Sequence, residues 1–219
     1  MADFTIYIGN KNYSSWSLRG WLMLKHSGAA FDEEVIPLEE ANTRANILRQ
    51  SPSGRLPALR HGDDVVWDSL AIGEYLAELF PEAQLWPQPL KARAAARAAS
   101  AEMHSGFAAL RSHLPMNVRS SFPNRGVTPE AQADINRIAA LWRDCRKRFG
   151  QGGEFLFGHF TIADAMYAPV VTRFLTYHVK LDKPSILYCQ TIMQMPEMQE
   201  WVKAARQEPE EIEELGMEF

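Results

Sequence analysis

A short serine-rich segment near the amino terminus offers the clearest chemistry in the chain. Residues 14–19 read Ser-Ser-Trp-Ser-Leu-Arg and follow an apolar run at 4–8, which is typical of a buried strand. The apolar spacing from 17 to 27 predicts a helix that ends at Gly28. The first N–H groups of a helix have no intrahelical partners, and the helix dipole is positive there. Hydroxyls at this junction can therefore hold an anion such as a thiolate or a carboxylate.

A second junction of this kind follows at Asp68 and Ser69, where a short apolar run gives way to another helical pattern. The Ser69 hydroxyl and the first-turn amides suit a carboxylate, whereas the Asp68 side chain suits an ammonium group. Aspartate and serine are also the usual N-caps of helices, so a purely structural role stays open. The same alternative holds for the serines at 14 and 15.

The elements around these two junctions predict a small α/β domain. A second strand is expected at 34–38, and it should pair in parallel with the first, since strand, helix and strand of this length form a right-handed crossover. Apolar runs at 57–60 and 65–67 flank a tight polar turn, which predicts an antiparallel hairpin. Helices are expected at about 41–50 and 70–79. The order up to residue 80 describes a compact domain on a small mixed sheet.

Three prolines between 80 and 89 mark a boundary, because proline interrupts helices and sheets. The pattern beyond them predicts only helices, at about 89–113, 130–149, 162–178, 185–194 and 197–207. We therefore divide the chain into an α/β domain at 1–80, a linker at 81–89 and an all-helical domain at 90–219. Thr161 and Asp164 form a capping signature before the third of these helices, which favours a structural role for Asp164.

Size, charge and cysteine usage bound the function. The chain has 219 residues, of which 46% are hydrophobic, so it can bury a sizeable core. A net charge of -4 with scattered basic residues argues against nucleic acid, and no apolar run approaches the ~20 residues that span a bilayer. Cys145 and Cys189 lie too far apart for a Cys-x-x-Cys motif, which suits a reducing compartment. We expect a cytoplasmic protein with a small-molecule partner, and the acidic tail from Glu208 to Phe219 is interpreted as a solvated end.

Four motifs together resemble those of the cytosolic glutathione transferases. They are residues 14–19, the turn Ser-Pro-Ser-Gly-Arg-Leu-Pro at 51–57, Asp68-Ser69, and Gly-His-Phe-Thr-Ile-Ala-Asp-Ala at 158–165. The resemblance runs nearly end to end and implies a thioredoxin-like N-terminal domain followed by an all-helical domain. Residues 14–19 are most similar to the zeta class, whose pattern is Ser-Ser-Cys-Ser-Trp-Arg and which includes maleylacetoacetate isomerases. The chain departs from that pattern at Trp16, which stands where the zeta class has cysteine.

The resemblance implies that a serine hydroxyl activates the thiol of glutathione. Ser14 is the expected catalytic donor, and Ser15 is close enough to share the role. A thiol with a pKa near 8.5 is only a few per cent ionised at neutral pH, and lowering that pKa by about two units requires roughly 2.7 kcal/mol. A hydroxyl donor together with a helix N-terminus can supply this stabilisation. Since glutathione provides the nucleophile, no metal is needed.

The rest of the glutathione site is also implied by the resemblance. Leu56 and Pro57 match a turn that carries a cis-proline in the family and pairs with the cysteinyl backbone of glutathione. Arg55 could hold a glutathione carboxylate, or it could be a solvated surface charge. Asp68 and Ser69 match the site of the γ-glutamyl end, where most members of the family have Gln or Glu at the first position.

The second substrate is expected to lie against the long helix after the linker. Side chains at spacings of three and four share one face there, and the loop after the helix adds two candidates for an anionic substrate. These candidate residues are Met103, His104, Phe107, Arg111, Asn117 and Arg119. A lone histidine on an apolar face is more often a packing residue than a catalytic one, so both interpretations of His104 stay open.

The sequence therefore predicts a glutathione transferase that joins the thiolate to a small, partly hydrophobic electrophile. The resemblance implies a homodimer with an active site in each subunit. One alternative is a glutathione-dependent cis-trans isomerase of the maleylacetoacetate type, and another is a non-catalytic binding protein with the same fold. A thiol-disulfide oxidoreductase is disfavoured because no cysteine lies in residues 14–19.

Overall fold

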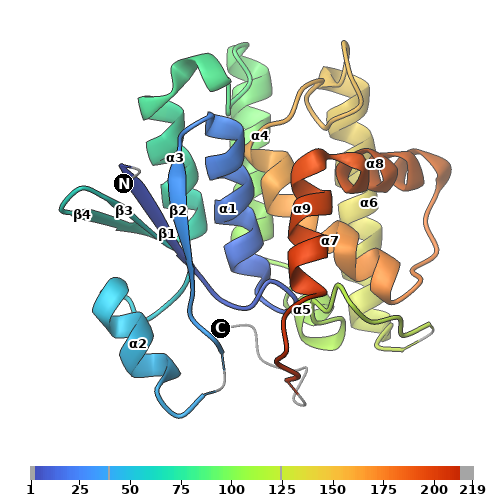
Figure 1. Ribbon diagram of the computed structural model, residues 1–219. Helices are drawn as coiled ribbons and strands as arrows, with labels where there is room; N and C mark the ends of the chain where they lie inside the picture. The colour runs from blue at the N-terminus through green and yellow to red at the C-terminus, as the bar shows by residue number, and fades with distance from the viewer. Residues whose placement is uncertain (1–2, 39, 124, 213–219) are drawn as a thin grey trace.

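The computed structural model describes residues 3–38, 40–123 and 125–212. The first part of the chain forms a four-stranded mixed sheet (Figure 1). The strands, in spatial order, are β2 (Phe31–Val35), β1 (Phe4–Ile8), β3 (Ala58–His61) and β4 (Asp64–Trp67). β1 pairs in parallel with β2, whereas β1 with β3 and β3 with β4 are antiparallel. The predicted crossover and hairpin are thus confirmed. The second strand lies three residues earlier than predicted.

Helices make up the rest of the described chain, apart from loops and the short 3-10 turn η1 (Pro81–Ala83). The helices are α1 (Ser15–Ser27), α2 (Thr43–Gln50), α3 (Ser69–Leu79), α4 (Leu90–Ser105), α5 (Ala108–His113), α6 (Pro129–Phe149), α7 (Ile162–Thr176), α8 (Lys183–Gln194) and α9 (Pro196–Ala205). The α/β unit followed by an all-helical unit confirms the predicted fold class.

The single helix predicted at 89–113 is wrong, because the chain forms two helices there. α4 ends at Ser105, and Gly106 continues in an extended conformation. Phe107 then has a left-handed backbone with φ 58°, after which α5 begins at Ala108. A Cβ on Gly106 would lie 2.7 Å from the carbonyl oxygen of Glu102, so glycine is the residue that lets the backbone leave α4 here.

Alternate residues of β1 face the two sides of the sheet. Ile6 and Ile8 belong to the large core, which includes residues of α1 and α3. Tyr7 belongs to a smaller cluster with Ile47 of α2 and with Leu56. The period of two along the strand thus places α1 and α3 on one face and α2 on the other.

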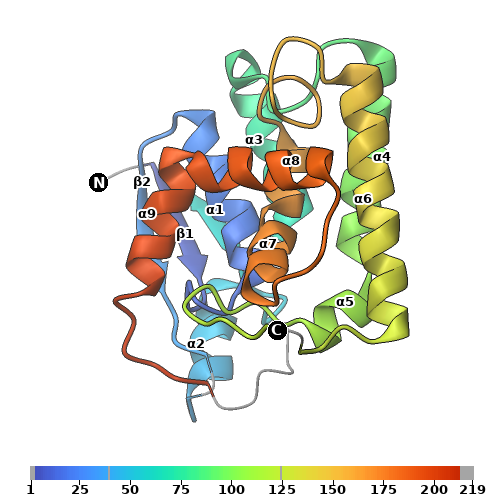
Figure 2. The same cartoon turned by 90° about the vertical axis from the view of Figure 1, so that its right-hand side faces the viewer.

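Helix α1 lies between the sheet and the helical half of the molecule, as both views of the ribbon show (Figures 1 and 2). It packs against α3 on one side and against α7 and α9 on the other. Leu18, Trp21 and Leu22 are fully buried, and even the charged Arg19 is 0% exposed. The helix that carries the serine turn is therefore held on nearly all sides.

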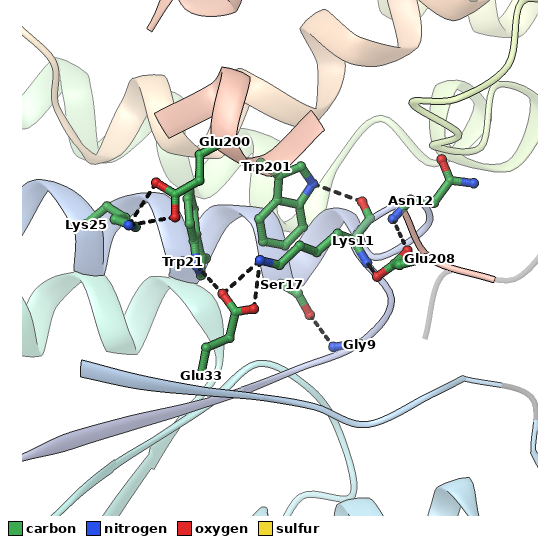
Figure 3. Close-up of polar contacts among 10 residues, drawn as sticks. All are labelled: Gly9, Lys11, Asn12, Ser17, Trp21, Lys25, Glu33, Glu200, Trp201 and Glu208. Carbon is green, nitrogen blue, oxygen red and sulfur yellow. Dashed lines mark hydrogen bonds and ion pairs between the residues drawn. The ribbon is translucent and has the colours of Figure 1, made fainter. Parts of the chain in front are cut away.

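A buried lysine joins α9 and the sheet to the loop before α1 (Figure 3). The Lys11 ammonium lies 2.7 Å from a carboxylate oxygen of Glu33 and 5.2 Å from the ring centroids of both Trp21 and Trp201. Trp21 donates to the same carboxylate at 2.6 Å, and Trp201 donates to the carbonyl of Lys11 at 2.9 Å. The charge is thus paired as well as surrounded by aromatic rings, which holds the loop in place.

The predicted capping box at the start of α7 is confirmed. The Asp164 carboxylate is 0% exposed and accepts from the backbone N–H and the hydroxyl of Thr161 at 2.9 and 3.0 Å. It also accepts from the backbone N–H of Leu156 at 3.1 Å and from the Tyr188 hydroxyl at 3.0 Å. Burial raises the pKa of Asp164 to about 6, although the four hydrogen bonds act to lower it. Four donors converge on one carboxylate, so its role is structural.

Candidate active site

The serine turn joins the end of β1 to the start of α1. Ser14 is the N-cap of α1, and its hydroxyl accepts from the backbone N–H of Ser17 at 3.4 Å and donates to the Ser17 hydroxyl at 2.7 Å. The Ser17 hydroxyl also accepts from the backbone N–H of Gly9 at 3.0 Å (Figure 3). Ser14 and Ser15 are 8% and 1% exposed. The first turn of α1 carries no acidic residue, so its positive end is not neutralised from within the turn.

Asp68 and Ser69 start α3 with an unusual backbone. Asp68 has φ 73°, a left-handed value that is strained for a residue with a side chain, and one carboxylate oxygen accepts from the backbone N–H of Leu70 at 2.9 Å. The Ser69 hydroxyl is 1% exposed and has no hydrogen-bond partner among the described residues. A buried hydroxyl without a partner costs free energy, which a ligand that accepts its proton would recover.

The turn before β3 has the predicted cis peptide bond between Leu56 and Pro57. Both residues are buried, and a Cβ on Gly20 of α1 would lie 2.9 Å from the Pro57 ring. The turn is therefore held directly against α1. Arg55 is exposed, and within the described part of the chain no ion pair of its side chain is found.

His104 connects the beginnings of α1 and α3. Its Nε2 lies 2.7 Å from a carboxylate oxygen of Asp68, and its ring packs edge-on against Trp16 with centroids 5.1 Å apart. His104 and Trp16 are both partly exposed. His104 therefore lies in a polar contact between the two halves of the molecule, and not on the apolar face that the sequence suggested.

The other residues that were predicted to share a helical face with His104 lie in different places. Met103 and Phe107 are 0% and 8% exposed and belong to the core. Arg111 lies on α5, past the break, with its Nη1 3.5 Å from the His104 carbonyl and its guanidinium 5.6 Å from the centroid of Trp16. Of the four, the structure thus brings His104 and Arg111 together beside Trp16.

Of the two loop candidates, Arg119 is engaged elsewhere, whereas the buried side-chain oxygen of Asn117 has no hydrogen-bond partner among the described residues. The carbonyl of Asn117, a residue that is 5% exposed, accepts from the Thr176 hydroxyl at 2.8 Å. Arg119 donates to the carbonyls of Glu208 and Glu210, both at 2.6 Å. Neither contact points to a substrate.

Residues 206–212, the C-terminal strap, pass beside the loop that precedes the serine turn. The Glu208 carboxylate accepts from the backbone N–H groups of Lys11 at 2.5 Å and Asn12 at 2.9 Å (Figure 3). The interpretation of this segment as a solvated end is therefore wrong for Glu208, and residues 213–219 lie outside the described part of the chain. The carboxylate satisfies two backbone donors just before Ser14, which fixes the approach to α1.

Two buried arginines accompany Arg111 beside this turn, and neither is among the site residues predicted from the sequence. Arg19 of α1 and Arg173 of α7 are both 0% exposed. Burial and the neighbouring charge of Arg111 lower the pKa of Arg19 to about 9, and burial together with the charges of Arg19 and Arg111 lowers that of Arg173 to about 9. Arg19 lies within the 14–19 motif, but nothing in the sequence shows that α5 and α7 bring further arginines to it.

Three further observations concern the described residues as a whole. No group of three or more histidine, cysteine, aspartate or glutamate side chains in this part of the chain is arranged to hold a metal ion. None of the helices that the structure describes is long and apolar enough to cross a membrane. Both cysteines are free and buried, and burial raises the pKa of each thiol to about 12, so neither is a ready nucleophile.

The fold combines a thioredoxin-like unit, which carries a polar site at two helix starts, with a helical unit. Comparison with known proteins identifies the family that has this fold. The family models for the glutathione S-transferase N-terminal and C-terminal domains match residues 13–79 and 93–204. The chain belongs to the glutathione S-transferase family.

Relatives with assigned names are similar over part of the chain. "Glutathione S-transferase 1" of Dianthus caryophyllus is 39% identical over 90 residues, which are 41% of this chain and 40% of that protein. "Glutathione S-transferase Z2" of Arabidopsis thaliana is 26% identical over 160 residues, 69% of this chain and 70% of that protein. The match thus spans less than half of the first relative's length.

Solved structures share the fold over almost the whole chain. A glutathione transferase homolog from Burkholderia gl BGR1, with bound glutathione, has a TM-score of 0.72 at 22% identity and covers 94% of this chain and 99% of its own. The theta class glutathione S-transferase from Xanthomonas axonopodis pv. citri, also with glutathione bound, has a TM-score of 0.66 at 20% identity and covers 92% and 98%. These similarities confirm the fold.

Proposed function

We propose that the protein is a glutathione transferase, in which the thiolate of bound glutathione attacks an electrophilic carbon of a second substrate. Family membership supports this proposal, and so do the two helix starts with a serine at each. The observation that carries it is the Ser69 hydroxyl, buried at the start of α3 without a partner in the described structure. His104 connects this helix start to Trp16, next to the serine turn.

Glutathione fits these features residue by residue. The γ-glutamyl carboxylate would accept from the Ser69 hydroxyl and the first amides of α3, and the ammonium group would lie near Asp68. The backbone of Leu56 would pair with the cysteinyl backbone, as an added strand does. The thiolate would then lie at the start of α1, where Ser14 can donate to it, and Arg55 would face the other carboxylate of glutathione.

The direct test is a titration of the bound thiol. On mixing the protein with glutathione, the ultraviolet difference absorbance of the thiolate should titrate with a pKa about two units below the ordinary value near 8.5. The same protein should consume glutathione when a chlorodinitrobenzene is added. A bound thiol that still titrates above pH 8, or a protein that does not bind glutathione, would overturn the proposal.

Replacing Ser69 tests the γ-glutamyl site separately. The Ser69→Ala variant is expected to raise the KM for glutathione by about tenfold or more, because a charge-assisted hydrogen bond to a carboxylate is lost. The fold should not suffer, since the hydroxyl has no partner to lose among the described residues. Urea unfolding of the same variant supplies the control, and an unchanged KM would remove Ser69 from the site.

Glutathione-dependent isomerisation is a second candidate activity. Similar relatives include the Arabidopsis protein named Z2 and a "Probable maleylacetoacetate isomerase" of Caenorhabditis elegans, which is 31% identical over 93 residues. Both activities begin from the same thiolate. Net consumption of glutathione marks the transferase, whereas isomerisation of a cis-enedione acid leaves glutathione unchanged.

We further propose a cytoplasmic homodimer. Exposed apolar side chains on β4, at the end of α3 and at the start of α4, namely Trp67, Leu79 and Leu90, are 45%, 40% and 73% exposed and offer contact area to a second subunit. Free, buried cysteines agree with a reducing compartment. Sedimentation equilibrium would test the dimer.

A further inference from the structure

Three arginine side chains from three different helices lie together beside the serine turn. They are Arg19 of α1, Arg111 of α5 and Arg173 of α7, and the positive charge of each of the first two acts on the third. Arg19 is the least satisfied of them. Its side chain is 0% exposed, and none of its three guanidinium nitrogens has a hydrogen-bond partner among the described residues.

A buried guanidinium in this state is costly, since it has given up water without gaining acceptors. Two neighbouring positive charges add repulsion. The carboxylates whose charges act on Arg19 and Arg111 are those of Asp68 and Asp134. Asp68 is already engaged with His104 and the start of α3, and Asp134 accepts from the backbone N–H of Leu110 at 2.9 Å. Among the described residues, no carboxylate is therefore left to pair with the charge of Arg19.

The position of this cluster relates it to the reaction. Arg19 lies four residues after Ser15, one helical turn further along α1. Its guanidinium packs on the ring of Trp16, 4.2 Å from the centroid, and Arg111 lies 5.6 Å from the same ring. Trp16 and Arg111 are partly exposed, so solvent reaches the cluster at these two residues, next to the serine turn.

We propose that Arg19, with Arg111 and Arg173 beside it, binds a carboxylate of the second substrate, so that the protein selects electrophiles carrying that group. The inference rests on the proposed transferase function. A guanidinium presents two parallel N–H donors, which match the two oxygens of a carboxylate. The ring of Trp16 supplies a flat apolar surface next to it for the body of the substrate.

The test compares two electrophiles that differ only in charge, 4-chloro-3,5-dinitrobenzoate and 4-chloro-3,5-dinitrobenzamide. In both, the thiolate sulfur forms a bond to the ring carbon that carries chlorine, and the carbon–chlorine bond breaks to release chloride. The wild type should convert the benzoate with a kcat/KM about tenfold to a hundredfold above that of the amide, as expected for a charge-assisted bidentate contact. The preference should reside mainly in KM.

The variants Arg19→Met and Arg111→Gln should each reduce this benzoate-to-amide ratio towards one. The matched control is Arg148→Met, because Arg148 is an exposed arginine that pairs with Asp144 on the far helix α6. A readout without turnover is the melting temperature in the presence of dinitrobenzoate, which should rise for the wild type and for Arg148→Met but not for Arg19→Met.

The outcomes distinguish a failure of this inference from a failure of the proposed transferase function. If the amide is conjugated and the bound thiol is ionised, but the wild type shows no preference for the benzoate, the carboxylate site is refuted and the transferase stands. A preference that survives both Arg19→Met and Arg111→Gln would also refute it. Should Arg19→Met fail to fold, the partly exposed Arg111 still decides the question through Arg111→Gln.

Discussion

The Ser14→Gly variant is expected to lose about 10²–10³-fold in kcat/KM for conjugation, and the pKa of bound glutathione should rise towards that of the free thiol. The Ser14 hydroxyl now donates to Ser17 at 2.7 Å. With a thiolate present, it would exchange this neutral acceptor for a charged one, which makes a stronger hydrogen bond. Glycine retains most of the N-cap preference, so the variant removes the hydroxyl with little loss of stability.

Three further variants separate catalysis from capping. Ser14→Thr keeps a hydroxyl and should retain most of the activity, whereas Ser14→Ala should lose both activity and about 1 kcal/mol of stability. Ser15→Ala measures how much Ser15 contributes to activation of the thiol. Stopped-flow conjugation and thiol titration give the readouts. Full turnover in the protein with both Ser14→Gly and Ser15→Ala would exclude a serine-activated thiol.

Removing the Asp164 carboxylate is expected to destabilise the fold more than any other single change considered. Asp164→Ala would leave the N–H groups of Leu156 and Thr161 and the hydroxyls of Thr161 and Tyr188 without their acceptor inside the core. We expect a loss of about 3–4 kcal/mol in the free energy of unfolding, since each buried donor that loses its partner is costly. Urea denaturation measures this loss.

The control for this prediction is Tyr188→Phe, which removes one of the four donors and keeps the ring. Its expected cost is about 1 kcal/mol. The loss of stability for Asp164→Asn should lie between those for Tyr188→Phe and Asp164→Ala, because the amide oxygen still accepts while the NH2 group faces donors. A loss below about 1 kcal/mol for Asp164→Ala would contradict the structural role.

Local signals predicted the caps, and long-range contacts account for what the sequence did not show. The N-caps at Ser14 and Asp68 and the capping box at Asp164 each depend on residues within a few positions of one another. β2 was placed too late because its own residues are mostly exposed, while the apolar run that suggested a strand lies at 34–38. A strand at the edge of a sheet need not show the hydrophobic pattern of a central one.

The arginine cluster could not be predicted for a different reason. Arg19, Arg111 and Arg173 are separated by 62 residues or more along the chain. The packing of α1 against α7 brings Arg19 and Arg173 together, and a hydrogen bond from Arg173 to the carbonyl of Leu114 joins the end of α5 to α7. The break between α4 and α5 also redirects Arg111, since a continuous helix would have kept it on the face of Met103. Sequence spacing describes one helix at a time, whereas this site is built between helices.

The burial of α1 limits how this protein can be engineered. Its side chains contact α3 within the first half of the chain and α7 and α9 in the second, so exchanging halves between relatives at the proline-rich segment cuts through one shared core. Chimaeras made there should aggregate unless the residues of α7 and α9 that face α1 are transplanted with it. Libraries for altered selectivity are better confined to α5, which carries Arg111.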